Sequence, residues 1–215
     1  MRALNVAALA GLALCGSASA AEFAMMETAQ RINEGTFKLS GFPVVIDRDD
    51  EDDDPETGFA LGLGYGLPYD LDAEVQVAAY EDGTFLGADL EWNVWRRERM
   101  ALSIGGGAHG ADLEKSGSLV GVDGTLIFSY SPIERLALSA AFDAAYDDVN
   151  DRDANAPTDT RFPTDGQYET YYAVPGISFL LTRNIDLLAE VGVGLNGDAD
   201  DYVSAGVSWY FRPSR

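Results

Sequence analysis

The sequence predicts an all-β fold: a single up-and-down antiparallel β-barrel that spans a membrane with about ten strands, or eight as the alternative. Segments that alternate apolar and small polar residues recur along the chain, as in strands whose two faces meet different surroundings. After the first twenty residues, no stretch is long and apolar enough for a transmembrane helix, so membrane insertion would have to use strands. The connections fall into two alternating classes, short turns and acidic loops, which is typical of the two ends of such a barrel.

Residues 1–20 have the pattern of a secretory signal peptide. Arg2 supplies the positive charge, residues 3–14 form the apolar run, and small residues precede a cleavage site after Ala20. A lipoprotein signal is disfavoured because a leucine precedes Cys15, where a small residue is needed. Cleavage after Ala20 would remove the single cysteine, so the mature chain would need no disulfide chemistry.

The charge balance excludes one class of function. The chain has 14 basic and 36 acidic residues, a formal charge of −22, and loss of the signal peptide with its one arginine makes this −23 (13 − 36). A strongly negative chain disfavours nucleic-acid binding, because the phosphate backbone attracts basic surfaces. The length that remains after cleavage fits one domain.

Residues 21–35 are predicted to form a short N-terminal helix or leader. Met25, Ala29 and Ile32 fall on one helical stripe, and Gly35 follows as a stop signal. This helix would plug the barrel or lie at the periplasmic membrane surface, and a loosely ordered leader is an equal alternative.

The barrel itself is predicted over residues 36–211, followed by a C-terminal tail at 212–215. In the last strand, the apolar residues Val203, Val207, Trp209 and Phe211 share one face, while serines, a glycine and tyrosines form the other. The other strands repeat this alternation. The predicted strands are Thr36–Ile46, Gly58–Leu67, Leu71–Tyr80, Thr84–Trp95, Met100–Ala111, Ser118–Tyr130, Arg135–Asp147, Tyr168–Leu181, Ile185–Asn196 and Asp201–Phe211.

The two classes of connection predict the orientation of the barrel. Short turns are typical of the periplasmic end, and longer acidic loops of the extracellular end, which places both chain termini in the periplasm. The short class comprises residues 67–70, 96–99, 131–134 and 182–184, and the acidic class comprises 47–56, 81–84, 112–117, 148–167 and 197–200.

The signal peptide, the alternating strands and the aromatic-ended final strand together resemble the small bacterial outer-membrane β-barrels, the OmpA-, OmpX- and opacity-protein-like superfamily. The resemblance covers roughly residues 36–211 and implies a porin-like fold in the outer membrane of a Gram-negative cell. It also implies contacts with outer-membrane lipid, lipopolysaccharide and the barrel-assembly machinery, for which Trp209 and Phe211 would form the aromatic girdle and assembly strand. Phe211 matches the terminal aromatic residue, although four residues follow it here. We expect a monomer.

Some barrels of this superfamily are enzymes with a histidine near the outer rim. His109 is the only histidine and is predicted to face the lumen near that end. Its expected cross-strand neighbours are Gly87 and Leu119, and the nearest carboxylates, Asp89 and Asp123, are expected further down the barrel. A nucleophile and its base need to approach within about 3 Å, so no catalytic residues are predicted.

The acidic loops predict no cofactor and no dedicated metal site. Residues 151–162 match part of a calcium loop, but Ala156 replaces the required glycine and Phe162 the closing glutamate. The acidic block at residues 49–54 is expected to be solvated. Weak contacts with the divalent cations that bridge lipopolysaccharide phosphates are the alternative role of these loops.

An acidic band is predicted inside the barrel. If Asp82-Gly83 forms a two-residue turn, Glu74 pairs with Glu91 on the adjacent strand, and both point into the lumen beside Gly64 and Gly105. Two interpretations remain: basic side chains cross the lumen and fill it with an ion network, which is favoured, or water and cations occupy it. The band comprises Glu74, Glu91, Asp89, Asp123, Asp143 and Glu190, and the candidate counter-charges are Lys38, Arg97, Arg99 and Arg135.

The sequence therefore favours a structural or surface-interacting outer-membrane barrel that acts through acidic extracellular loops. A narrow cation-preferring pore through the acidic lumen is the alternative function. An enzyme with a site at the rim ranks third.

Overall fold

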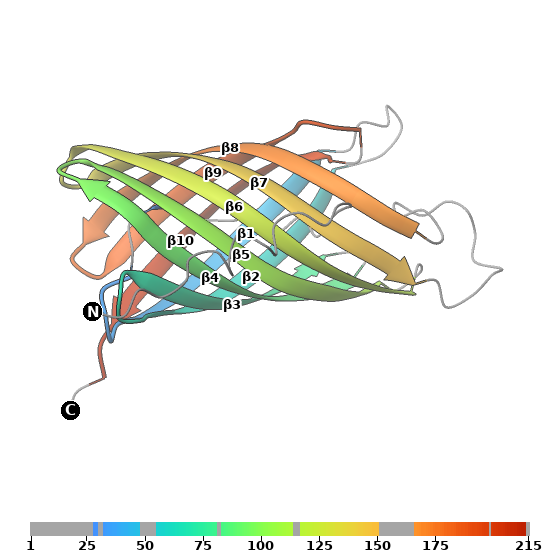
Figure 1. The fold of residues 1–215 in the computed structure, drawn as a ribbon, viewed down its shortest axis with the longest axis horizontal. Helices are drawn as coiled ribbons and strands as arrows, with labels where there is room; N and C mark the ends of the chain where they lie inside the picture. The colour runs from blue at the N-terminus through green and yellow to red at the C-terminus, as the bar shows by residue number, and fades with distance from the viewer. Residues whose placement is uncertain are drawn as a thin grey trace, which may run out of the picture.

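The structure, a computed structural model, describes residues 28–29, 32–47, 55–80, 83–113, 117–150, 166–197 and 199–213. Within them, antiparallel strands form one closed barrel, because β1 pairs with both β2 and β10 (Figure 1). The strands are β1 (Phe37–Asp47), β2 (Glu56–Gly66), β3 (Leu71–Tyr80), β4 (Gly83–Arg97), β5 (Met100–Leu113), β6 (Gly117–Ile133), β7 (Leu136–Asn150), β8 (Gly166–Thr182), β9 (Ile185–Gly194) and β10 (Asp201–Phe211).

This architecture confirms the predicted fold class with ten strands, each within a few residues of its expected bounds. The short turns lie at one end of the barrel, called here the short-turn end, where Phe37 at the start of β1 pairs with Phe211 at the end of β10 (Figure 1). The opposite end is called the loop end. The predicted signal peptide and most of the predicted acidic loops, including residues 49–54 and 151–165, lie outside the described residues.

The outer face of the barrel is a nearly continuous apolar surface. Leu61, Leu63, Val203 and Val207 are all exposed there, and Trp209 is 48% exposed. Water would not favour so many exposed large apolar side chains on one closed surface, whereas lipid tails would. The outer face therefore confirms the predicted transmembrane barrel. No helix within the described residues is both long and apolar enough to cross a membrane.

The lumen is less polar than the last strand predicts. Phe42, Val44 and Ile46 of β1 point inward and are 0–1% exposed, because the even-numbered residues of this strand face the lumen. They pack with aromatic and aliphatic side chains from other strands into one buried cluster that fills the lumen toward the loop end. We call this the apolar cluster, and its other large members are Phe85, Leu119, Val149, Tyr168, Tyr172, Val174 and Tyr202.

The described part of the leader is not helical. Thr28, Ala29 and residues 32–36 form irregular, bend or turn structure at the short-turn end of the barrel, with Ala29 fully buried and Ile32 6% exposed. The Ala29 amide donates to Ser129 Oγ at 2.8 Å, and the Ile32 amide donates to Asp72 Oδ2 at 2.7 Å. These bonds to the barrel wall replace the bonds that a helix would make within itself, so this segment closes the lumen from below.

Candidate functional site in the barrel lumen

The strand register differs from the predicted register by two residues between β3 and β4. Glu74 lies opposite Asp89, and Asp72 lies opposite Glu91, so Glu74 and Glu91 do not face each other. Tyr80 pairs with Gly83, which places the glycine in the ladder and not within the two-residue loop. A shift by two residues keeps every side chain on its predicted face, so these carboxylates still point into the lumen.

The inward-facing residues form three neighbouring rows that run across the strands. The lower row, nearest the short-turn end, contains Asp72, Glu91, Gly105, Thr125 and Asp143. The middle row contains Lys38, Gly64, Glu74, Asp89, Gly107 and Asp123, and the upper row contains Ser40, Gly62, Gln76, Gly87, His109, Gly121 and Asp147.

Lys38 and Glu74 form an ion pair although β2 lies between their strands. Lys38 Nζ is 2.5 Å from Glu74 Oε2, and both side chains are largely buried. Gly64 occupies the position between them, and a Cβ there would lie 3.2 Å from Glu74 Oε2 and 3.3 Å from the Lys38 Cβ. The missing side chain leaves room for the contact. Lys38 is therefore the predicted counter-charge that the structure places inside the lumen.

His109 makes the second two-strand contact. Its Nε2 is 2.5 Å from Asp147 Oδ1, and its Nδ1 is 3.1 Å from Asp123 Oδ1. Gly121 separates the strands of His109 and Asp147, and a Cβ there would overlap both side chains. Both carboxylates accept a hydrogen bond from the ring when it carries N–H groups at both nitrogens, as the imidazolium does. The expectation that His109 has no carboxylate within reach was wrong.

The remaining members of the predicted acidic band also face the lumen. Asp89 lies over Gly107, next to Asp123 on the far side of that glycine, and Asp143 lies opposite Thr125. Glu190 is buried beside Ser204. Carboxylates outnumber basic side chains among the described lumenal residues. Each of the basic side chains Lys38 and His109 therefore has a carboxylate close enough for direct contact.

Arg97, Arg99 and Arg135 do not reach the acidic band. All three are exposed at the short turns, and Arg99 Nη1 donates to the Pro132 carbonyl at 2.6 Å. Arg97 points outward because a β-bulge between Asn93 and Trp95 adds one residue to β4 and reverses the direction of the side chains that follow. The prediction of these arginines as lumenal counter-charges was wrong.

The aromatic residues of the last strand lie at the short-turn end. The Trp209 and Phe211 rings are 4.8 Å apart, and Phe211 also stacks on Phe37 with ring centroids 5.5 Å apart. Phe37 and Phe211 are directly paired where β1 meets β10. The last strand therefore closes the barrel through backbone pairing and through this aromatic group.

The lumenal network connects charged side chains of different strands. No group of three or more metal-ligating side chains with suitable geometry occurs within the described residues. The two His109 nitrogens point to carboxylates on different strands, so they hold those strands together. Sequence reasoning missed this arrangement, although one signal was available: inward glycines on the strand between two charged side chains.

Comparisons with known proteins support the fold. No family model and no curated protein match the chain. An outer membrane channel from Pseudomonas putida F1 is similar in structure, with a TM-score of 0.57 and 11% identity, covering 85% of this chain and 98% of that chain. The KdgM porin (TM-score 0.47, 10% identity, 81% and 99% covered) and the Ail attachment invasion locus protein of Yersinia pestis (0.39, 14%, 83% and 99%) are more distant. The similarity to the outer membrane channel, at 11% identity, shows a shared architecture and no finer property.

Proposed function

We propose that this outer-membrane β-barrel is closed to ions and acts through its outer surface. Its role would be in membrane integrity, or in contacts that its acidic connections make with envelope or host molecules. The short turns would face the periplasm and the acidic loops the cell exterior, as the two classes of connection predict. The observation that supports the proposal most is the filling of the described lumen at three successive levels.

A different kind of group occupies each level of the lumen. The apolar cluster occupies the lumen toward the loop end, with Phe42 fully buried. Ion pairs occupy the middle, where Lys38 meets Glu74 and His109 meets two aspartates. The leader segment around Ala29 and Ile32 occupies the short-turn end. A hydrated path for ions would need all three levels to move.

A cation-preferring pore is the alternative function that this arrangement disfavours. The observation in favour of a pore is the excess of lumenal carboxylates, such as Glu74, Asp89 and Glu91, which would select cations. However, a pore needs a continuous wet path, and most of the side chains that are buried together in the apolar cluster are hydrocarbon, which water hydrates poorly. A barrel of about this size is ordinarily filled by its own side chains.

A catalytic role for His109 is also disfavoured. A general base needs a ring nitrogen directed at the group that loses its proton. Both ring nitrogens of His109 are directed at carboxylates, Asp123 and Asp147. The ring therefore stabilises the lumen in this proposal.

Planar-bilayer recording of the purified mature chain tests the closed barrel. We expect no single-channel steps, because the buried apolar cluster would block a hydrated path for ions. Cation-selective steps that lose their selectivity in the Glu74→Gln, Glu91→Gln double variant would establish the pore function instead. A variant that lacks residues 21–35 should still fail to conduct, because the apolar cluster remains in place.

Neutralising the acidic block at residues 49–54 tests the surface role. We expect normal amounts of folded barrel but a more permeable outer membrane, measured as increased sensitivity of the cells to detergent. The matched control removes acidic charge from the short turns with Glu98→Gln and Glu134→Gln, and should leave permeability unchanged. Equal permeability in all three strains would contradict a role for the acidic loops.

A further inference from the structure

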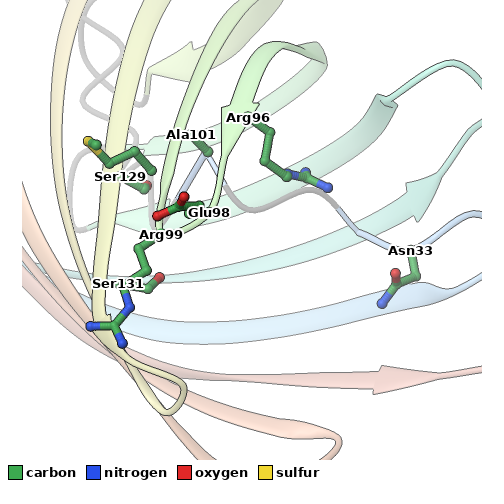
Figure 2. A pocket seen from close by; sticks show the side chains of 8 residues that line it. Asn33, Arg96, Glu98, Arg99, Ala101, Ser129 and Ser131 are labelled. Carbon is green, nitrogen blue, oxygen red and sulfur yellow. The ribbon is translucent and has the colours of Figure 1, made fainter.

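A pocket of about 300 Å³ lies at the short-turn end, between the turns of β4–β5 and β6–β7 and the N-terminal segment (Figure 2). Its polar lining consists mainly of groups that can donate hydrogen bonds. Guanidinium, hydroxyl and amide donors together form a lining that suits a group with several oxygen acceptors. The lining residues that matter here are Asn33, Arg96, Glu98, Arg99, Ser129 and Ser131.

Arg96 reaches this pocket because of the β-bulge in β4. Strict alternation from the buried Asn93 would turn Trp95 inward and Arg96 outward. The register shift between Asn93 and Trp95 reverses this, so Trp95 pairs with Leu102 on the outer face. Arg96 then pairs with Ala101, which is buried on the lumenal side, and its side chain extends from β4 toward the side of the pocket where Asn33 lies (Figure 2). Bulges commonly redirect a side chain at the rim of a barrel, and they often occur beside functional sites.

The surrounding residues leave donor capacity in the pocket. Among the described residues, Arg96 has no hydrogen bond or ion pair. Arg99 is fixed through one N–H, which donates to the Pro132 carbonyl, and its guanidinium has further donors. Ser129 is buried and accepts a hydrogen bond from the Ala29 amide, so its hydroxyl hydrogen can still point elsewhere.

We infer that this pocket binds an oxyanion, a phosphate or carboxylate group, with Arg96 as the anchor. A planar guanidinium can make two parallel hydrogen bonds to such a group. The lumen beyond the pocket carries the lower row of carboxylates, including Asp72 and Glu91, which would repel an anion. The ligand would therefore stay at the mouth. The Glu98 carboxylate in the lining would oppose binding and so limit its strength.

The pocket volume suits a small ligand or the head of a larger one. If the short turns face the periplasm, two sources are available: a soluble periplasmic phosphate compound, or the headgroup of an anionic phospholipid in the adjacent leaflet. Both present the same oxyanion. The inference does not depend on the proposed function, because a closed barrel and a conducting barrel would both retain this mouth.

Calorimetric titration tests the site with the mature chain in an uncharged detergent and a phosphate-free buffer, using inorganic phosphate and glycerol 3-phosphate as probes. We expect saturable binding that Arg96→Gln weakens about tenfold or more, as expected for loss of a charge-assisted pair. The matched control is Arg97→Gln, which removes the same charge from the next residue, on the outer face, and should change affinity less than about twofold. Glu98→Gln should strengthen binding.

Two results would overturn the inference: no saturable binding of either probe at millimolar concentrations, or equal weakening by Arg97→Gln and Arg96→Gln. The second result would mean that the rim attracts anions only through its net charge. Different mobilities of unheated and boiled protein on gels would show that each variant is folded. Repeating the titration in nanodiscs with phosphatidylglycerol or with phosphatidylcholine identifies the source. Competition by phosphatidylglycerol alone would identify the headgroup, and unchanged affinity would identify a soluble anion.

Discussion

Toward the loop end, side chains of the barrel wall fill the lumen, whereas toward the short-turn end it is closed by a segment that precedes the first strand. Phe42, Val44 and Ile46 are buried because β1 itself turns them inward. Ala29 and Ile32 are held by individual hydrogen bonds to Ser129 and Asp72. The first closure is part of the fold, and the second can be removed in principle without unpairing any strand.

The largest expected effect is at the apolar cluster. Phe42→Ala should lower the free energy of unfolding by about 4 kcal/mol, because it opens a cavity that neighbouring strands cannot close. Urea unfolding in lipid vesicles measures the change. Phe59→Ala on the lipid-facing side is the matched control and should cost less, because lipid can fill the space. Similar losses for the two variants would contradict a tightly packed lumen.

The next effect is at His109, above the middle of the lumen. His109→Ala should cost about 3 kcal/mol, because it leaves Asp123 and Asp147 without their shared partner. Adding Asp123→Asn and Asp147→Asn to this variant should recover most of the loss. The same unfolding assay provides the comparison, and a triple variant no more stable than His109→Ala would show that charge burial is not the cause.

A smaller effect is expected for the ion pair that crosses β2. In a double-mutant cycle, Lys38→Met and Glu74→Gln should show a coupling free energy of about 2 kcal/mol, because the charged groups are largely buried and in direct contact. Pairing Lys38→Met with Asp143→Asn gives a control across the lumen. A coupling near zero for Lys38 and Glu74 would mean that solvent screens the contact.

The smallest effect should be at the short-turn end. Ser129→Ala removes the acceptor of the Ala29 amide and should cost about 1 kcal/mol in the mature chain. In a chain that lacks residues 21–35, the same substitution should be nearly neutral, because the amide is gone. If Ser129→Ala costs the same in both chains, the leader does not depend on this bond.

The sequence was sufficient to predict the barrel, the approximate strand bounds and the face on which the carboxylates of the predicted acidic band lie, although Asp72 and Asp147 were not included in that band. These properties depend on a period of two, which survives errors in pairing. The partners were harder to predict. Placing Gly83 within the turn shifted the β3–β4 register by two residues, so Glu74 was matched with Glu91 and not with Asp89.

The candidate site was missed for a related reason. His109 was expected beside Leu119, but the structure places Gly121 there, again two residues away. Pairing of adjacent strands also does not reveal which side chains meet across an intervening strand, as Gly64 and Gly121 permit. The bulge between Asn93 and Trp95 cannot be predicted from alternation, and it turned Arg97, a predicted lumenal counter-charge, to the outer face.

The lumenal glycines have a consequence for how this sequence can change over time. A methyl group at Gly121 would overlap both His109 and Asp147, so alanine could appear there only after one of those partners had become smaller. The same order of events applies less strictly at Gly64, between Lys38 and Glu74. In descendants of this gene, each glycine and the two side chains it separates should therefore be inherited together or lost together, as units of three positions on three adjacent strands.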